Sequence, residues 1–144
     1  MNNVLSTITL LATAAVAVML AAGAAATELR PFASDACSAF PDGTPSQQTL
    51  WLHCCMEHDI AYWAGGTRRQ RHAADAALKQ CVAATGEPAI ANLMLAGVRV
   101  GGTPYLPTSF RWGYGWPYPR GYKALSKSER DAVETGLRAE GLRE

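Results

Sequence analysis

The sequence predicts a small, mainly α-helical domain that is linked by disulfides and built on an antiparallel helix pair. Three observations lead to this fold class. A chain of 144 residues is long enough for one small domain. Helix start and stop signals follow one another over residues 46–84, with Gly65-Gly66 between two helical segments. The four cysteines all fall within residues 37–81, and an even number of cysteines in a small exported domain indicates disulfides.

The N-terminal segment indicates export. Residues 4–26 carry no charge and end in Ala24-Ala25-Ala26, small residues of the kind that precede a signal-peptidase cleavage site. We therefore predict a signal peptide over residues 1–26. The segment is also long enough to cross a bilayer, so an uncleaved membrane anchor is the alternative. In either case we expect residues 27–144 to be secreted or periplasmic. A net charge of +1 gives no indication of a nucleic-acid partner, and we expect a monomer.

The cysteines can pair in two ways. Neighbouring residues on a helix point about 100° apart, so a disulfide between Cys54 and Cys55 is disfavoured. One of these two cysteines is therefore expected to pair with Cys37 and the other with Cys81. Because the domain is small and its core correspondingly thin, such links are expected to contribute to its stability.

The first helical segments follow from local signals. Residues 33–48 contain Pro41, Asp42-Gly43 and Pro45, and they predict an irregular loop. Ser46 is expected to cap a helix that ends near Ala64, before the Gly65-Gly66 stop. Thr67 is expected to cap a second helix over residues 68–84. So short a connection predicts antiparallel neighbours.

The rest of the chain predicts two further helices and an aromatic coil. A third helix is expected over residues 88–98 with proline at its start. Residues 103–122 are dense in proline, glycine and aromatic residues, and they predict ordered coil. Ser126 and Glu129 form a capping-box pattern for a last helix. The aromatic coil is expected to pack as a lid over the helix pair, with a place at a membrane interface as the alternative.

The first helix carries an unusual set of polar residues. Cys54, Cys55 and Tyr62 lie three or four residues from His58, so they share one helical face with it. A histidine is a natural general base when a carboxylate holds one of its ring nitrogens. Asp75 on the second helix is the best candidate. It lies six residues before Cys81, so a disulfide from Cys81 to Cys54 would bring it level with His58.

The side chain of Asp59 is expected to point in a different direction, about 100° around the helix from His58. It is expected to face the loop of residues 33–43, which offers Asp35 and free main-chain carbonyls. A site with carboxylate and carbonyl oxygens favours Ca²⁺ over zinc. A base beside a hard cation is suited to the attack of water on an ester.

These residues resemble a known family. The pattern Cys54-Cys55-x-x-His58-Asp59-x-x-Tyr62 is similar to the active-site helix of secreted phospholipase A2. Asp75 followed by Cys81 is similar to the family's second helix, and residues 35–42 resemble the calcium loop of its bacterial members. The resemblance covers residues 35–81, which is less than half of residues 27–144.

The resemblance implies a phospholipase A2-like domain over residues 27–144, with an aromatic-rich C-terminal extension, and a role for each matching residue. His58 would activate water, Asp75 would orient His58, and Tyr62 would support Asp75. Ca²⁺ would be bound by the side chains of Asp59 and Asp35 and by the carbonyl of Ala36. The disulfides would be Cys37–Cys55 and Cys54–Cys81. The implied reaction is hydrolysis of the sn-2 ester of a glycerophospholipid at a membrane surface, a step of lipid degradation.

Other interpretations of the same residues stay open at this point. Asp75 could pair with Arg71 and Lys79 on a solvated helix face, and Asp35 could cap its loop. The basic residues of the second helix could contact lipid headgroups or simply face solvent; they are Arg68, Arg69 and Arg71. Four residues of the first helix could instead bind zinc: His53, Cys54, Cys55 and His58. The rival function is a non-catalytic module that binds lipid or protein on the same scaffold.

Overall fold

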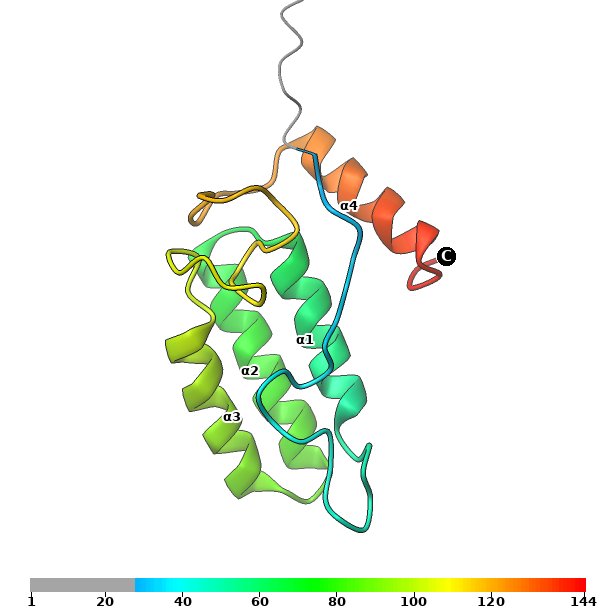
Figure 1. Ribbon diagram of the computed structural model, residues 1–144, viewed down its shortest axis with the longest axis vertical. Coiled ribbons are helices and arrows are strands. Elements are labelled where there is room, and N and C mark those ends of the chain that lie inside the picture. Colours follow the sequence, from blue (N-terminus) through cyan, green and yellow to red (C-terminus); the bar gives the residue numbers. More distant parts are fainter. Residues whose placement is uncertain (1–27) are drawn as a thin grey trace, which may run out of the picture.

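A computed structural model describes residues 28–144, so the predicted signal peptide or anchor lies outside the described residues. In the described residues the first three helices of the sequence lie side by side, and the last is set apart from them (Figure 1). The four helices of this part of the chain are α1 (Leu52–Ala64), α2 (Arg68–Ala84), α3 (Pro88–Gly101) and α4 (Lys127–Ala139). Residues 28–144 contain no strand beyond one isolated bridge between Thr44 and Gln47. The mainly α fold class is confirmed.

The first two helices are antiparallel. Three links join them: the Cys54–Cys81 disulfide, a contact from His58 to Asp75, and one from Tyr62 to Arg71. Residue numbers rise along α1 as they fall along α2, which is the order that an antiparallel pair requires. The second helix starts where the sequence predicts, because Thr67 accepts a hydrogen bond from the Gln70 amide and forms a capping box.

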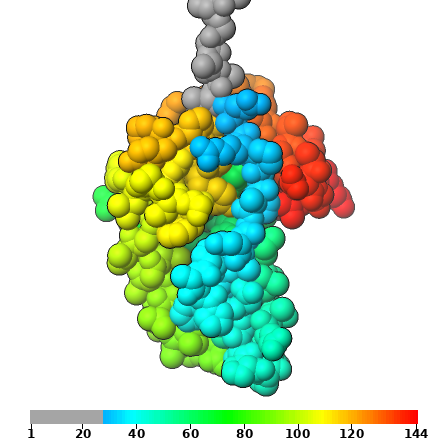
Figure 2. Space-filling view, viewed as in Figure 1, coloured from blue at the N-terminus to red at the C-terminus, as the bar shows by residue number. Residues whose placement is uncertain are grey.

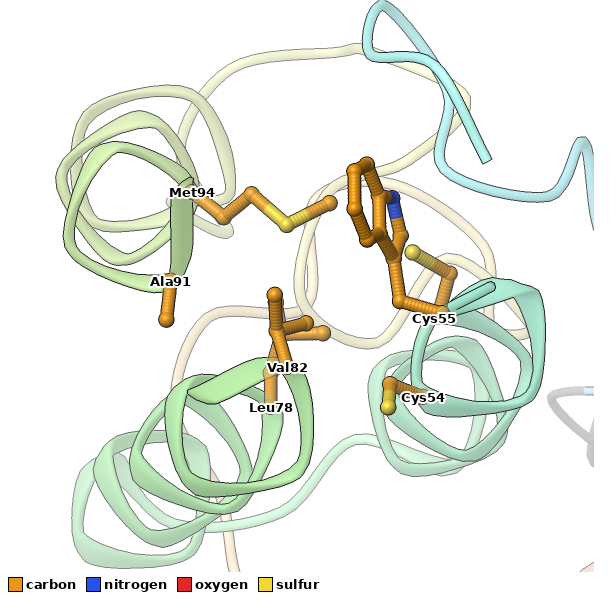
Figure 3. Close-up of a cluster of buried hydrophobic side chains, with 7 residues drawn as sticks. Cys54, Cys55, Leu78, Val82, Ala91 and Met94 are labelled. Carbon is orange, nitrogen blue, oxygen red and sulfur yellow. The ribbon is translucent and has the colours of Figure 1, made fainter. Parts of the chain in front are cut away.

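One hydrophobic core fills the space among α1, α2 and α3. Figure 3 shows Leu78 and Val82 of α2 between Cys54 of α1 and Met94 of α3. Trp51, only 3% exposed, belongs to the same cluster. Cys54 and Cys55 belong to this core, and the partly buried Cys37 and Cys81 pack against it. Each disulfide therefore joins the core to its edge.

A second core lies at the C-terminal end of α1. It joins Trp63 and Trp116 to Val133 and Leu137 of α4. The indole N–H of Trp63 donates to the Arg30 carbonyl at 2.8 Å, and that of Trp116 donates to the Ala64 carbonyl at 2.8 Å. Each large ring thus buries its apolar area and still satisfies its polar atom.

The aromatic coil divides into buried and exposed residues. Trp112 and Trp116 are each 1% exposed and cover the end of the helix pair, as the lid interpretation predicts. Four other large side chains of residues 103–122 remain in solvent: Tyr105, Leu106, Phe110 and Tyr118. A membrane-interface role for these exposed residues stays a prediction.

The first helix begins later than the sequence predicts. It starts at Leu52 after Trp51, and no side chain of residues 28–144 caps it. The predicted cap, Ser46, instead contacts the Thr44 hydroxyl within a turn. Residues 44–51 form turns because two hydrogen bonds hold Trp51 against the preceding loop. Its amide donates to the Asp42 carbonyl, and its indole donates to the Pro41 carbonyl. The third helix runs three residues beyond its predicted end, to Gly101.

The structure contains both disulfides that the resemblance implies, Cys37–Cys55 and Cys54–Cys81. Disulfides of this kind fit a protein of an oxidising compartment, such as the periplasm or the extracellular space. Among residues 28–144, none of the helices has the length and apolar character that a membrane crossing requires.

Candidate active site between the first two helices

His58 and Asp75 meet in the interface between α1 and α2. His58 Nε2 lies 3.1 Å from Asp75 Oδ1, and the two residues are 8% and 0% exposed. Within residues 28–144, the other ring nitrogen of His58, Nδ1, makes no hydrogen bond. One nitrogen is therefore held by a carboxylate, while the other is left for a molecule from outside the protein.

Tyr62 supports the same carboxylate. Its hydroxyl donates to Asp75 Oδ1 at 2.7 Å, and its ring lies against His58 with 4.2 Å between the centroids. Burial raises the pKa of Tyr62 far above its usual value, although a hydrogen bond from Arg71 opposes the shift. Tyr62 thus stays a neutral hydrogen-bond donor to Asp75.

Two arginines neutralise the second oxygen of Asp75. Arg99 Nε of α3 lies 2.6 Å from Oδ2, at an angle that makes the contact an ion pair rather than a hydrogen bond. Arg71 Nε lies 3.9 Å from the same oxygen. Burial alone would raise the pKa of Asp75, but hydrogen bonds from His58 and Tyr62, together with nearby positive charge, hold that pKa below its usual value. Asp75 is therefore a carboxylate at neutral pH.

The buried role of Arg71 contradicts both sequence-based interpretations of this residue. Arg71 is 4% exposed, so it neither contacts lipid headgroups nor faces solvent. Its guanidinium donates to Tyr122 Oη at 2.6 Å and to the carbonyls of Val98 and Arg99. Its pairing with Asp75 occurs inside the protein, and no ion pair joins Lys79 to Asp75 in residues 28–144. Of the three arginines that the sequence places at the start of α2, Arg68 and Arg69 are exposed and Arg71 is not.

Asp59 lies on the neighbouring side of α1, as the helical spacing predicts. It is 9% exposed, and its Oδ2 accepts a hydrogen bond from Ser34 Oγ at 2.6 Å. Burial raises the pKa of Asp59 to about 6, although the hydrogen bond from Ser34 and the charge of His58 oppose the shift. Asp35 adds to the rise through its negative charge. Within residues 28–144 no cation forms an ion pair with Asp59.

The loop before α1 has an unusual backbone. Ala36 and Ser38 have positive φ angles of 65° and 57°, a conformation that costs about 1–2 kcal/mol for residues with a side chain. Cys37 lies between them, and its disulfide to Cys55 anchors the loop to α1. Asp35 Oδ1 accepts a hydrogen bond from Ser38 Oγ at 2.8 Å. Asp35 thus closes a turn, as the loop-capping interpretation predicts, while its other carboxylate oxygen makes no hydrogen bond in residues 28–144.

Asp35 and Asp59 line one cavity of about 560 Å³. Its walls come from the segment before α1 and from the aromatic coil, which are joined where Tyr114 Oη donates to the Ala33 carbonyl at 2.6 Å. Both predicted carboxylates therefore border one space, and their joint binding of a cation stays a prediction. Sequence reasoning did not identify the aromatic coil as a wall of this cavity.

The structure contradicts the zinc alternative. His53 Nε2 lies 3.4 Å from the sulfur atoms of both Cys54 and Cys81. Those sulfur atoms are joined in a disulfide, and Cys55 is bonded to Cys37. Zinc is bound by thiolates, which a disulfide does not provide.

Comparisons of the chain with known protein families, with curated proteins and with solved structures found no match.

Proposed function

We propose that the protein is an exported hydrolase of the phospholipase A2 type, which cleaves the sn-2 ester of glycerophospholipids with the help of Ca²⁺. One observation carries the proposal. A buried histidine is held at one nitrogen by a carboxylate, with 3.1 Å between His58 Nε2 and Asp75 Oδ1. The next residue along the helix is an acid that opens into a cavity.

His58 is the proposed general base. The ionised Asp75 favours the tautomer with its proton on Nε2, which leaves the lone pair of Nδ1 free to accept a proton from water. When His58 becomes charged, Asp75 stabilises the imidazolium. Tyr62 and Arg99 hold Asp75 in its ionised form and in one orientation, so they act through Asp75 rather than on the substrate.

The residues around Asp59 fit a calcium ion by their chemistry. Asp59 is a buried carboxylate whose charge no cation balances within residues 28–144, and Asp35 shares its cavity. Asp59 and Asp35 would bind the ion through carboxylate oxygens, and Ala36 would add a carbonyl oxygen. A bound Ca²⁺ would stabilise the negative charge that develops on the ester carbonyl oxygen.

A non-catalytic binding module is the second candidate. The observation that favours it is the 2.6 Å hydrogen bond from Ser34 Oγ to Asp59 Oδ2, which satisfies one of the oxygens that calcium would need. In that case the cavity would bind lipid or a protein segment without cleaving it.

The two candidates are separated by release of fatty acid from phospholipid vesicles, measured with Ca²⁺ and with a chelator. His58→Gln is expected to lower the rate about 10²–10⁴-fold, because it removes the general base. His53→Gln is the matched control on the same helix, since His53 is exposed and its ring has polar contacts only to the disulfide within residues 28–144. Equal release by the wild type and His58→Gln would leave only the binding module.

A further inference from the structure

The cavity beside Asp59 has a second end with the opposite charge. Arg30 and Arg111 line it together with Thr108, and the acids Asp35 and Asp59 lie at the first end. The segments that form the walls lie side by side in Figure 2, where residues near 30 are blue and residues near 110 are yellow. Within residues 28–144, neither arginine forms an ion pair. The cavity therefore contains two positive charges that no acid of the described chain neutralises by direct contact.

Arg111 is fixed in place rather than free to turn into solvent. It is 3% exposed, and its guanidinium donates to the Gly113 carbonyl at 2.8 Å and to the Trp116 carbonyl at 2.6 Å. Its guanidinium also lies 5.5 Å from the centre of the Tyr118 ring. These neutral partners orient the charge without cancelling it. Burial and the nearby charge of Arg30 both lower the pKa of Arg111, and the two arginines line the same cavity.

Thr108 supplies an independent observation. Its Oγ1 is buried and has no hydrogen-bond partner within residues 28–144, although buried hydroxyl groups are almost always paired. The same residue lines the cavity beside Arg111. An anion placed there would accept hydrogen bonds from the hydroxyl and from the guanidinium groups, and it would balance the charge of the two arginines.

We propose that Arg30, Arg111 and Thr108 form a subsite for the phosphate-bearing headgroup of an anionic glycerophospholipid. This inference rests on the proposed function, because it places the headgroup at one end of the cavity and the calcium ligands at the other. A volume of about 560 Å³ is sufficient for a small polar headgroup such as phosphoglycerol. A choline headgroup is disfavoured, because its quaternary ammonium would approach two guanidinium groups of the same charge.

The test uses Arg30→Gln, because Arg30 is exposed and its side chain makes no hydrogen bond or ion pair in residues 28–144. Arg138→Gln is the matched control, with the same loss of charge at an exposed position of α4 outside the cavity. Thr108→Val is a second variant that removes the hydroxyl and keeps the shape. Arg111 is left unchanged because its contacts stabilise the coil.

The first measurement is calorimetric binding of glycerol phosphate and of inorganic phosphate in the presence of a chelator. Loss of a hydrogen bond to a charged group costs about 1.5–3 kcal/mol, so Arg30→Gln is expected to weaken binding of glycerol phosphate about tenfold or more. Thr108→Val is expected to weaken it as well, and Arg138→Gln to leave it unchanged. Equal affinities for Arg30→Gln and Arg138→Gln would overturn the subsite.

The second measurement compares hydrolysis of phosphatidylglycerol and phosphatidylcholine vesicles. Arg30→Gln is expected to raise KM for phosphatidylglycerol more than KM for phosphatidylcholine, because the choline headgroup is bound less well at this subsite in the wild type. If the wild type binds glycerol phosphate through Arg30 but cleaves neither lipid, the subsite stands and the hydrolase proposal fails. If lipid is cleaved with the same headgroup preference by the wild type and Arg30→Gln, the hydrolase stands and the subsite fails. Equal affinity for both phosphates without any vesicle preference would indicate a free-phosphate site and overturn the headgroup assignment.

Discussion

The two ends of α1 are held by different chemistry. At its N-terminal end, Cys54 and Cys55 are bonded to α2 and to the loop before the helix. At its C-terminal end, within residues 28–144, there is no disulfide, and Trp63 lies fully buried among the aromatic coil and α4. The N-terminal end of α1 is therefore held by covalent bonds, and the C-terminal end is held by the packing of large aromatic rings.

The difference shows two ways to stabilise a domain with a small core. A disulfide stabilises mainly by restricting the unfolded chain, so it tolerates partly exposed partners such as Cys37 and Cys81. A tryptophan core needs close packing in the folded state. Gly115 and Gly136 lie so near Trp63 that a Cβ atom on either would approach the ring within 2.6 Å and 2.8 Å. His58 and Asp75 lie between these ends, where both constraints limit their movement.

The largest expected effect comes from the charged contact between the two ends. Asp75→Asn leaves Arg99 and Arg71 without their buried counter-charge, and breaking a buried pair in this way costs about 3–5 kcal/mol. Urea denaturation at pH 7 would measure the loss. The exposed pair of Asp131 and Lys127 gives the control, because Asp131→Asn is expected to cost less than about 0.5 kcal/mol. Equal costs for the two variants would show that the ends of α1, and not its centre, hold the helix pair.

The same variant has a pH dependence with a defined sign. The pKa of Asp75 is lower in the folded protein than its usual value of 3.8, so the carboxylate stabilises the fold above that pH. This stabilisation is lost as pH falls through the folded pKa. The difference in free energy of unfolding between the wild type and Asp75→Asn should therefore be constant near pH 7 and shrink below about pH 4. A difference that grew on acidification would contradict the assignment of Asp75 as an ionised group.

The covalent end is tested by removing each disulfide with paired Cys→Ser changes. The Cys54–Cys81 link spans 27 residues, which gives an expected loss of about 3.5 kcal/mol from chain entropy. The Cys37–Cys55 link spans 18 residues, and its expected loss is about 3 kcal/mol. Denaturation without reductant measures both. Losses below about 1 kcal/mol for both would mean that packing alone holds this end.

The aromatic end is tested by a smaller change. Gly136→Ala places a methyl group 2.8 Å from the Trp63 ring, and such overpacking costs about 1–3 kcal/mol. Gly97→Ala on α3 is the matched control, since within residues 28–144 no atom beyond its own stretch of helix lies within 4 Å of the added Cβ. That control should stabilise the helix by about 0.5–1 kcal/mol. Thermal unfolding measures both variants. If both gain stability, the packing around Trp63 adjusts to an added methyl group, and the contrast between the two ends is weaker than the structure indicates.

The sequence predicted best what depends on near neighbours in the chain. The capping residues Thr67 and Ser126 begin α2 and α4 as predicted, because a cap needs only the next three residues. The contact between His58 and Asp75 was predicted, because helical spacing and the cysteine positions indicate that the two residues lie at the same height along neighbouring helices. Ser46 failed as a cap because Trp51 is tied back to Pro41 and Asp42. That contact depends on how the whole loop packs.

The sequence by itself determined which residues carry the proposed chemistry: His58, Asp59 and their spacing follow from the period of one helix. Only the tertiary structure decided which charged side chains lie near them. Arg99 reaches Asp75 from α3, and Arg111 reaches the cavity from the aromatic coil. Neither position has a local pattern that marks it, because the partners of both side chains come from the way distant segments pack. Arg111 is buried by that packing, whereas Arg99 stays partly exposed while it contacts Asp75.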